Sequence, residues 1–338
     1  MHINKTSSLL LVAGAAFIII AANITDTGFE ASTKLIDVYK ELDEPMPSHY
    51  IEQLDETKIK SGKELIFQGW TYKSSKKKSK LISKHFVCTD CHNTVIEDPD
   101  LSEPNPETRL DFAIKNKLPF LQGTTFYGVV NRVHWYNGDY LKKYGALVEN
   151  ARDTLVNAIQ LCAKECSQGR YLEDWEVENI LHYFWSIQFD LKDLKITEEE
   201  RDKLKNSKNY TNQEKIDWLK TRYFLASPAT FLNVQTKDER KMGKDGDATK
   251  GKAIYDLSCL HCHGFEKDVA DLKLDYARNT FKQFKKNLKK DNDFTLYKIV
   301  RKGTPPDVGY RPYMPHFTKE RLSEQQLEDL VAYILSEL

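Results

Sequence analysis

Apolar residues recur at helical spacing in two stretches that lie far apart along the chain. These sets are Val177, Ile180, Leu181, Phe184 and Trp185, and then Leu327, Leu330, Val331, Ile334 and Leu335. Because residues three and four apart share one face of a helix, each set predicts an amphipathic helix. No alternating pattern of the kind that marks a β-strand competes over any length, so the sequence predicts an all-α fold.

Each of these two helices has a similar segment upstream. Residues 62–66 and 251–255 both begin with Gly-Lys and continue with apolar positions of helical type, so each predicts a short opening helix. The stretch over 191–245 is charged, and Thr197 and Glu200 form a capping-box pattern in it. We therefore expect two similar helical units joined by a helical connector.

The N-terminal residues form a separate segment. Leu9 to Ala22 is an apolar run that follows Lys5 and ends in small residues, which is typical of a secretory signal peptide over residues 1–24. The run is shorter than the roughly 20 residues of a membrane-spanning helix, so an uncleaved N-terminal anchor is the alternative. We expect export to the periplasm or the outer face of the cytoplasmic membrane of a bacterium, with membrane contact only through this segment if it stays uncleaved.

The composition does not suggest nucleic acid as a partner. The 338 residues contain 50 basic and 50 acidic side chains, so no global charge favours nucleic acid. Lysines do cluster locally, between residues 73 and 84 and between residues 282 and 290. Such runs are typical of solvated faces, and they would also suit the docking of an acidic protein.

Residues 88–92 and 259–263 both have the pattern Cys-x-x-Cys-His. This spacing lets two thiols reach the two vinyl groups of one porphyrin while the histidine binds the iron, so each copy predicts a covalently attached haem c. Zinc binding and thiol redox chemistry are the alternatives, but neither needs a histidine directly after both cysteine pairs. The predicted attachment residues are Cys88, Cys91, His92, Cys259, Cys262 and His263.

With two haems, the expected organisation is a pair of cytochrome c-like domains. Residues 25–190 would hold haem 1, residues 191–245 would be the helical connector, and residues 246–338 would hold haem 2. In the second domain Met314 stands just before the closing helix, where small cytochromes c carry the distal iron ligand. Its thioether would raise the haem potential, and His316 is the alternative ligand.

The first domain has no methionine at the corresponding place. Cys162 and Cys166, the two cysteines outside the attachment motifs, stand there instead. Either could give the iron a thiolate ligand, which would stabilise ferric iron and lower the potential of haem 1. A disulfide between them is one alternative, and His134 as distal ligand is another. With a thiolate at haem 1, electrons would pass from haem 1 to haem 2.

At these residues the chain resembles the dihaem thiosulfate dehydrogenases, or tetrathionate synthases, in which a cysteine-ligated haem precedes a methionine-ligated one. That family has an Ile-Asn-x-Cys segment, a serine four residues on, an Asn-Gly pair and a leucine. The matching residues here are Ile159, Gln160, Cys162, Cys166, Gln168, Gly169 and Leu172. The register implies that Cys162 is the ligand of haem 1.

Two departures from that family concern the substrate rather than the haems. The family arginine that is implied in holding the anionic substrate is Ala158 here, and the family serine is Cys166. A dianion beside a thiolate needs positive charge nearby, and Arg132, Arg152 and Arg170 are the candidates in this stretch.

Two functions follow from these residues. The first is a dihaem electron carrier that exchanges single electrons with a redox partner protein, either donor or acceptor, such as a respiratory complex. The second is an enzyme that oxidises thiosulfate to tetrathionate at haem 1, with Cys162 as its catalytic residue. A dihaem peroxidase fits less well, because no second ligand arrangement indicates a vacant, gated iron.

Overall fold

The computed structural model describes residues 28–266, 269–304 and 312–338. Within these ranges the chain forms helices, turns and three isolated β-bridges but no strand, which confirms the all-α prediction. No helix in the described part of the chain has both the length and the apolar character needed to span a membrane. The predicted signal peptide or anchor lies outside the described residues.

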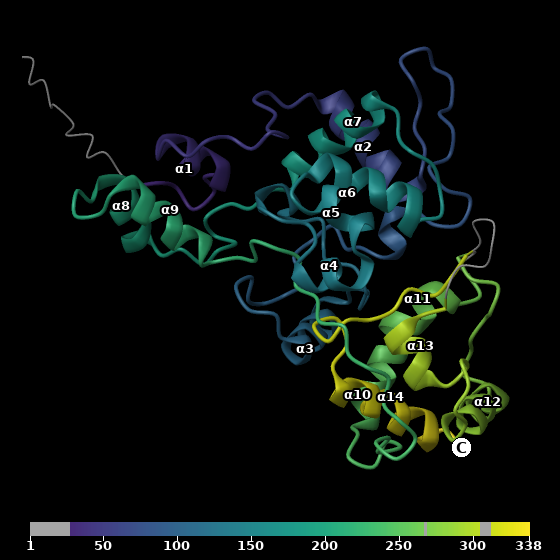
Figure 1. Cartoon of the computed structure of the whole chain (residues 1–338). Helices are drawn as coiled ribbons and strands as arrows, with labels where there is room; N and C mark the ends of the chain where they lie inside the picture. The colour runs from purple at the N-terminus through teal and green to yellow at the C-terminus, as the bar shows by residue number, and fades with distance from the viewer. Residues whose placement is uncertain (1–27, 267–268, 305–311) are drawn as a thin grey trace, which may run out of the picture.

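The α-helices follow one another along the chain and are placed as labelled in Figure 1. Their bounds are α1 (Leu35–Glu41), α2 (Glu56–Gln68), α3 (Pro106–Asn116), α4 (Gly138–Tyr144), α5 (Ala146–Arg152), α6 (Leu155–Leu161), α7 (Asp174–Ser186), α8 (Glu198–Asn206), α9 (Asn212–Lys220), α10 (Ala248–Ile254), α11 (Leu260–His263), α12 (Arg278–Leu288), α13 (Leu296–Lys302) and α14 (Glu324–Ser336).

The opening helix α2 packs directly against the closing helix α7 in the first unit. Gly62 lies at their crossing, and a Cβ atom there would come within 2.0 Å of the backbone oxygen of Asn179 and 3.0 Å of Cβ of Tyr183. Only glycine therefore permits this close approach. Asp55 begins α2 by accepting hydrogen bonds from the amides of Thr57 and Lys58.

The second unit repeats this crossing with α10 and α14. A Cβ atom at Gly251 would come within 1.9 Å of the backbone oxygen of Asp329 and 2.8 Å of Cβ of Tyr333. Ser323 and Gln326 form the capping box that begins α14. The glycine and the tyrosine thus have equivalent positions in the two helix pairs, as the sequence repeat predicted.

One segment of the predicted first domain belongs to the core of the second unit. Leu110 and Ala113 of α3 and the nearby Phe120 are buried with the side chains of α10, α13 and α14, and α3 lies beside α10 and α14 in Figure 1. The predicted boundary at residue 190 does not separate the two cores, because the loop after the first Cys-x-x-Cys-His motif extends across to the second unit.

The predicted connector is helical only over α8 and α9. These two helices pack with α1 into a third hydrophobic cluster that includes Leu35, Leu204 and Leu219, and the three helices form a separate lobe in Figure 1. Residues 221–247 contain no helix. The prediction of a helical connector over all of 191–245 is therefore wrong for its second half, where Phe231 instead contacts the rings of Tyr140 and Tyr144 of α4.

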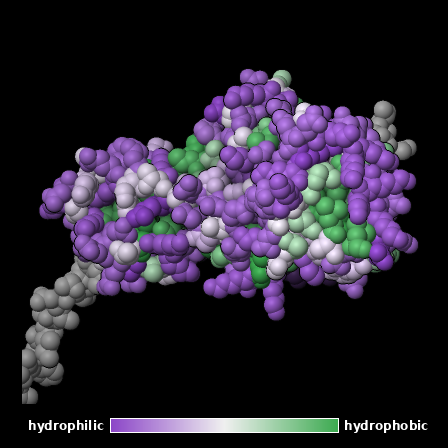
Figure 2. All heavy atoms as spheres, turned by 90° about the horizontal axis from the view of Figure 1, so that it is seen from below, coloured by the Kyte–Doolittle hydropathy of each residue, from purple (hydrophilic) through white to green (hydrophobic). Residues whose placement is uncertain are grey.

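Viewed from below, the surface is mostly hydrophilic, with one clear hydrophobic patch on the larger part of the molecule, away from the N-terminal lobe (Figure 2). Several large apolar side chains are exposed near the second Cys-x-x-Cys-His motif, among them Phe265 at 69% and Leu272 at 62% exposed. The second unit therefore exposes apolar side chains beside its motif.

Candidate functional site

A cavity of about 590 Å³ brings together the predicted ligands of the first unit. Cys88, Cys91 and His92 line it, and so do Cys162 and Cys166 from the turn that follows α6. A loop of the second unit also lines this cavity. It contains Met314, the predicted ligand of haem 2, and His316, the alternative ligand, together with Tyr313 and Pro315.

The walls of this cavity are mainly apolar and aromatic, as a porphyrin requires. They include Ile66, Ile82, Val129, Trp135, Tyr136, Leu155, Ala158, Leu172, Ile180 and Phe184. His134 is not among the lining residues, and its Nδ1 atom instead pairs with the carboxylate of Asp153. The structure therefore gives no support to His134 as an iron ligand.

A hydrogen bond to a backbone carbonyl orients the His92 ring for metal binding. Its Nδ1 atom lies 2.6 Å from the carbonyl oxygen of Thr124, so this nitrogen carries the proton and Nε2 is left with a free lone pair. Burial lowers the pKa of His92 to about 4, which keeps the ring neutral. A neutral imidazole with Nε2 available fits the donor that haem iron needs.

The second motif has the same arrangement. Nδ1 of His263 lies 2.8 Å from the carbonyl oxygen of Leu272, and burial lowers the pKa of His263. Burial also raises the pKa of Cys259 to about 12, and that of Cys88 likewise to about 12, so these thiols stay protonated. The residues of both motifs fit a covalently attached haem.

Gly123 is a site residue that the sequence reasoning missed. Its amide donates a hydrogen bond of 2.9 Å to the carbonyl oxygen of Cys91. A Cβ atom there would come within 2.5 Å of Cε1 of His92, so only glycine leaves room for the imidazole. Nothing in the local sequence marks this glycine, because its role depends on a contact made across the loop.

Cys162 and Cys166 lie on a π-helical turn, a local feature that is frequent at functional sites. All six cysteines of the chain are free thiols, so the disulfide alternative is not formed in this structure. A hydrogen bond between the two sulfurs lowers the pKa of Cys166, and this bond together with burial raises the pKa of Cys162. The two sulfurs are thus coupled to each other, and both line the cavity of the first motif.

The three candidate arginines have different surroundings. Arg132 lines the cavity and is buried, with hydrogen bonds to Ser227 and Thr125. Arg152 lies 3.5 Å from the carboxylate of Asp153, and Arg170 lies 2.7 Å from that of Glu176. Of the three, Arg132 alone is a lining residue.

Two lysines that the sequence reasoning did not consider also line this cavity. Lys143 comes from α4 and Lys302 from the end of α13. Burial, followed by the charge of Lys302, lowers the pKa of Lys143, and Nζ of Lys143 lies 4.1 Å from the centre of the Phe231 ring. The sequence holds no signal for this pair, because the two residues meet only when the units dock.

The two Cys-x-x-Cys-His motifs lie next to each other. Sγ of Cys262 is 3.8 Å from the carbonyl oxygen of Asp90, which lies inside the first motif. A second link joins the ligand-bearing loop to the cysteine turn, because the hydroxyl of Tyr313 donates a hydrogen bond of 2.9 Å to the carbonyl oxygen of Cys166. The two candidate haem sites are thus in direct contact through the protein.

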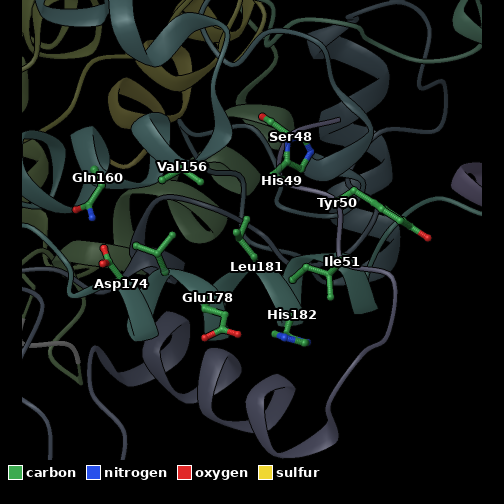
Figure 3. Close-up of a pocket in the computed structure, with 11 residues that line it drawn as sticks. Ser48, His49, Tyr50, Ile51, Val156, Gln160, Asp174, Glu178, Leu181 and His182 are labelled. Carbon is green, nitrogen blue, oxygen red and sulfur yellow. The ribbon is translucent and has the colours of Figure 1, made fainter. Parts of the chain in front are cut away.

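A second cavity, of about 430 Å³, contains none of the predicted ligands. His49, Asp174, Glu178 and His182 are among the residues that line it, and Figure 3 shows how these side chains lie beside α7. Glu178 pairs with Lys58. The cavity with the cysteine motif is therefore the candidate functional site.

Comparisons with known proteins match a part of the chain. Residues 246–334 match the family model described as cytochrome C oxidase, cbb3-type, subunit III. Cytochrome c-554(547) of Halothiobacillus neapolitanus is 33% identical over 91 residues, which cover 26% of this chain and 94% of that cytochrome. The chain belongs to the c-type cytochromes.

Membership gives this cytochrome a covalently bound haem c and a role in electron transfer. The matched residues include Cys259, Cys262 and His263. No solved structure gives a significant match to the chain.

Proposed function

We propose that this cytochrome holds two haems and passes single electrons from a low-potential haem 1 to a higher-potential haem 2 and on to a redox partner protein. Haem iron supplies the one-electron change between its ferric and ferrous states. The observation that carries this proposal is the distance of 3.8 Å between Sγ of Cys262 and the carbonyl oxygen of Asp90. With attachment sites this close, two haems would lie next to each other.

In this proposal each motif supplies its two thioether sulfurs and its histidine to one haem. Equivalent features support equivalent roles: Nδ1 of both His92 and His263 faces a backbone carbonyl, and Gly62 and Gly251 permit the same close crossing of helices. The domains holding haem 1 and haem 2 would act outside the cytoplasm, in the periplasm or on the outer face of the membrane.

Unequal distal ligands would set the direction of transfer. Met314 is held in its loop by a reciprocal pair of hydrogen bonds, in which its amide donates to Oγ1 of Thr304 at 2.8 Å and the amide of Thr304 donates to its carbonyl oxygen at 2.9 Å. Its thioether favours ferrous iron at haem 2, whereas a thiolate from Cys162 favours ferric iron at haem 1. Electrons then move from haem 1 to haem 2.

The partner is best matched by an acidic protein. Five exposed lysines lie on or directly after α12 of the second unit, at positions 282, 285, 286, 289 and 290. The exposed Phe265 and Leu272 flank the second motif. A basic and partly apolar surface of this kind would attract an acidic partner, and added salt would weaken the attraction.

Mass spectrometry and potentiometry of the mature protein test the proposal. We expect the mass of two haems and two separate midpoint potentials. The double variant Cys88→Ala/Cys91→Ala should lose one haem together with the lower potential, and Cys259→Ala/Cys262→Ala should lose the other haem together with the higher one. A mature protein with a single haem would refute the dihaem proposal.

Thiosulfate dehydrogenase activity at haem 1 is the second candidate function. In that reaction two thiosulfate ions form one S–S bond to give tetrathionate and release two electrons. The observation that favours it is that Cys162 lines the same cavity as the first motif, with Arg132, Lys143 and Lys302 to offset the charge of a dianion.

Turnover of thiosulfate with ferricyanide as electron acceptor tests this second function. Catalysis should be abolished in Cys162→Ala, whereas Lys143→Gln should chiefly raise KM because it removes charge without removing the sulfur. Absence of turnover in the holoprotein leaves the electron carrier as the function.

A further inference from the structure

A buried ion pair joins the two units beside the first motif. Arg321 precedes α14 in the second unit, and its Nη1 and Nη2 atoms donate hydrogen bonds of 2.7 and 3.0 Å to the two carboxylate oxygens of Glu97. Glu97 is 2% exposed and Arg321 is 4% exposed. Two parallel bonds between a guanidinium and a carboxylate make the most directional ion pair available to a protein.

Further bonds fix Arg321 in place. Its Nε and Nη2 atoms donate to the carbonyl oxygen of Leu121 at 3.0 and 2.8 Å. Arg109 donates to the backbone carbonyl of Arg321 and lies 3.9 Å from the carboxylate of Glu97. The guanidinium of Arg109 in turn covers the ring of Phe120 at 3.8 Å. The pair is therefore part of a packed interface and cannot rearrange without breaking several contacts.

The carboxylate of Glu97 also binds the two chain segments whose hydrogen bond to each other orients the His92 ring. It accepts 2.8 Å bonds from the amide of Thr125 and from Nδ2 of Asn93. Asn93 follows His92 in the sequence, and Thr125 follows Thr124, whose carbonyl oxygen lies 2.6 Å from Nδ1 of His92. Glu97 thus clamps together the two chain segments that this bond joins.

We propose that Arg321 is a positioning residue for His92, acting through Glu97. The second unit would thereby control how the first unit presents its proximal imidazole to haem 1. This inference rests on the proposed function in one respect, namely that His92 is the iron ligand of haem 1. Removing Arg321 leaves a buried carboxylate without its partner, and the clamp on His92 loosens.

The direction of the effect follows from the chemistry of the imidazole. A strong bond from Nδ1–H to a carbonyl oxygen makes the ring a better donor through Nε2, which stabilises ferric iron. A loosened bond weakens that donation, so the midpoint potential of haem 1 should rise. Loss of such outer partners typically weakens metal binding by roughly 10- to 100-fold.

Arg321→Met, produced as the full-length holoprotein, is the test, with Arg240→Met as matched control. Arg240 is also buried, at 6% exposed, and also binds backbone carbonyls, those of Leu288 and Lys290. In Arg321→Met we expect an altered low-spin electron paramagnetic resonance signal of haem 1 and a raised midpoint potential. The signal and potential of haem 2 should stay unchanged, and the control should leave haem 1 unchanged.

Arg321→Lys keeps the charge but cannot make two parallel bonds. It should therefore raise the midpoint potential of haem 1 by less than Arg321→Met does. It also provides a folded variant to measure if Arg321→Met does not fold. Native haem 1 properties in both variants would overturn the proposal, and so would equal changes at both haems. A wild-type protein that carries fewer than two haems contradicts the proposed function instead, which separates the two kinds of failure.

Discussion

At the scale of single residues, the environment of each group decides its chemistry more than its identity does. His92 and His134 are both histidines of the first unit, yet His92 faces a carbonyl inside an apolar cavity and His134 pairs with Asp153.

Glu97 and Asp98 are adjacent carboxyls with opposite pKa shifts. Arg321 lowers the pKa of Glu97 against the effect of burial, whereas burial and then the charge of Glu97 raise the pKa of Asp98 to about 6.

Asp98→Asn should make the protein more stable at neutral pH. The carboxyl has a pKa of 3.8 when unfolded and about 6 in the folded protein. A raised pKa means that the folded state binds the proton more tightly, so the wild type loses stability as pH rises from about 4 to about 6. The variant does not lose stability in this way. Above pH 6 its free energy of unfolding should exceed that of the wild type by about 1 to 3 kcal/mol.

Urea unfolding of the Asp98→Asn variant and the wild type between pH 4 and pH 8 would measure this difference. The two curves should converge near pH 4. A stability difference that does not change with pH would contradict the assignment.

Gly123→Ala should displace His92. The added methyl group would come within 2.5 Å of the imidazole carbon Cε1, and overpacking of this kind costs about 1 to 3 kcal/mol. Gly138→Ala is the control, because a Cβ atom there has nothing within 4 Å. Haem content and the low-spin signal of the proposed haem 1 would report the change, and a Gly123→Ala variant that matches the control would contradict this prediction.

At the scale of elements, the repeat predicted from the sequence corresponds to two similar helix pairs, α2 with α7 and α10 with α14, each of which crosses at a glycine. Local signals were sufficient for these helices, because apolar periodicity and the capping boxes at Thr197 and Ser323 need only neighbouring residues. The connector shows where local signals fail. Residues 221–247 contain apolar and aromatic side chains such as Tyr223, Phe224 and Phe231, but they form no helix.

Gly62→Ala and Gly251→Ala should each weaken the crossing in which the glycine lies. A Cβ atom would meet a backbone carbonyl at 2.0 Å in α2 with α7 and at 1.9 Å in α10 with α14, so the helices must move apart. We expect a loss of at least about 1 to 3 kcal/mol in each variant. If both proposed haems are present, thermal unfolding followed through each of them should show that Gly62→Ala affects haem 1 first and Gly251→Ala affects haem 2 first. Each variant then serves as control for the other.

At the scale of the whole molecule, the two units are not independent. α3 lies in the first half of the sequence, yet Leu110 is completely buried in the core of the second unit. The ion pair of Glu97 with Arg321 and the contact of Asp90 with Cys262 join the same two units. The docking of the units thus sets the relation between the two motifs.

Leu110→Ala should therefore destabilise the second unit, although residue 110 follows the first motif. Removing a fully buried leucine side chain costs about 2 to 5 kcal/mol. Unfolding monitored at the proposed haem 2 should shift to lower temperature. Ile114→Ala on the same helix is the control, because Ile114 is 43% exposed. A shift seen only at haem 1 would show that α3 stabilises the first unit instead.

Short-range patterns in the sequence predicted the opening and closing helices of both units and the two Cys-x-x-Cys-His motifs, because each depends on residues that lie within a few positions of one another. The tertiary structure alone decided which residues meet across the units. Arg321 and Glu97 are 224 positions apart and Cys262 and Asp90 are 172 apart. No periodicity or motif extends over such separations, so a buried charge pair of this kind appears only once the cores have packed.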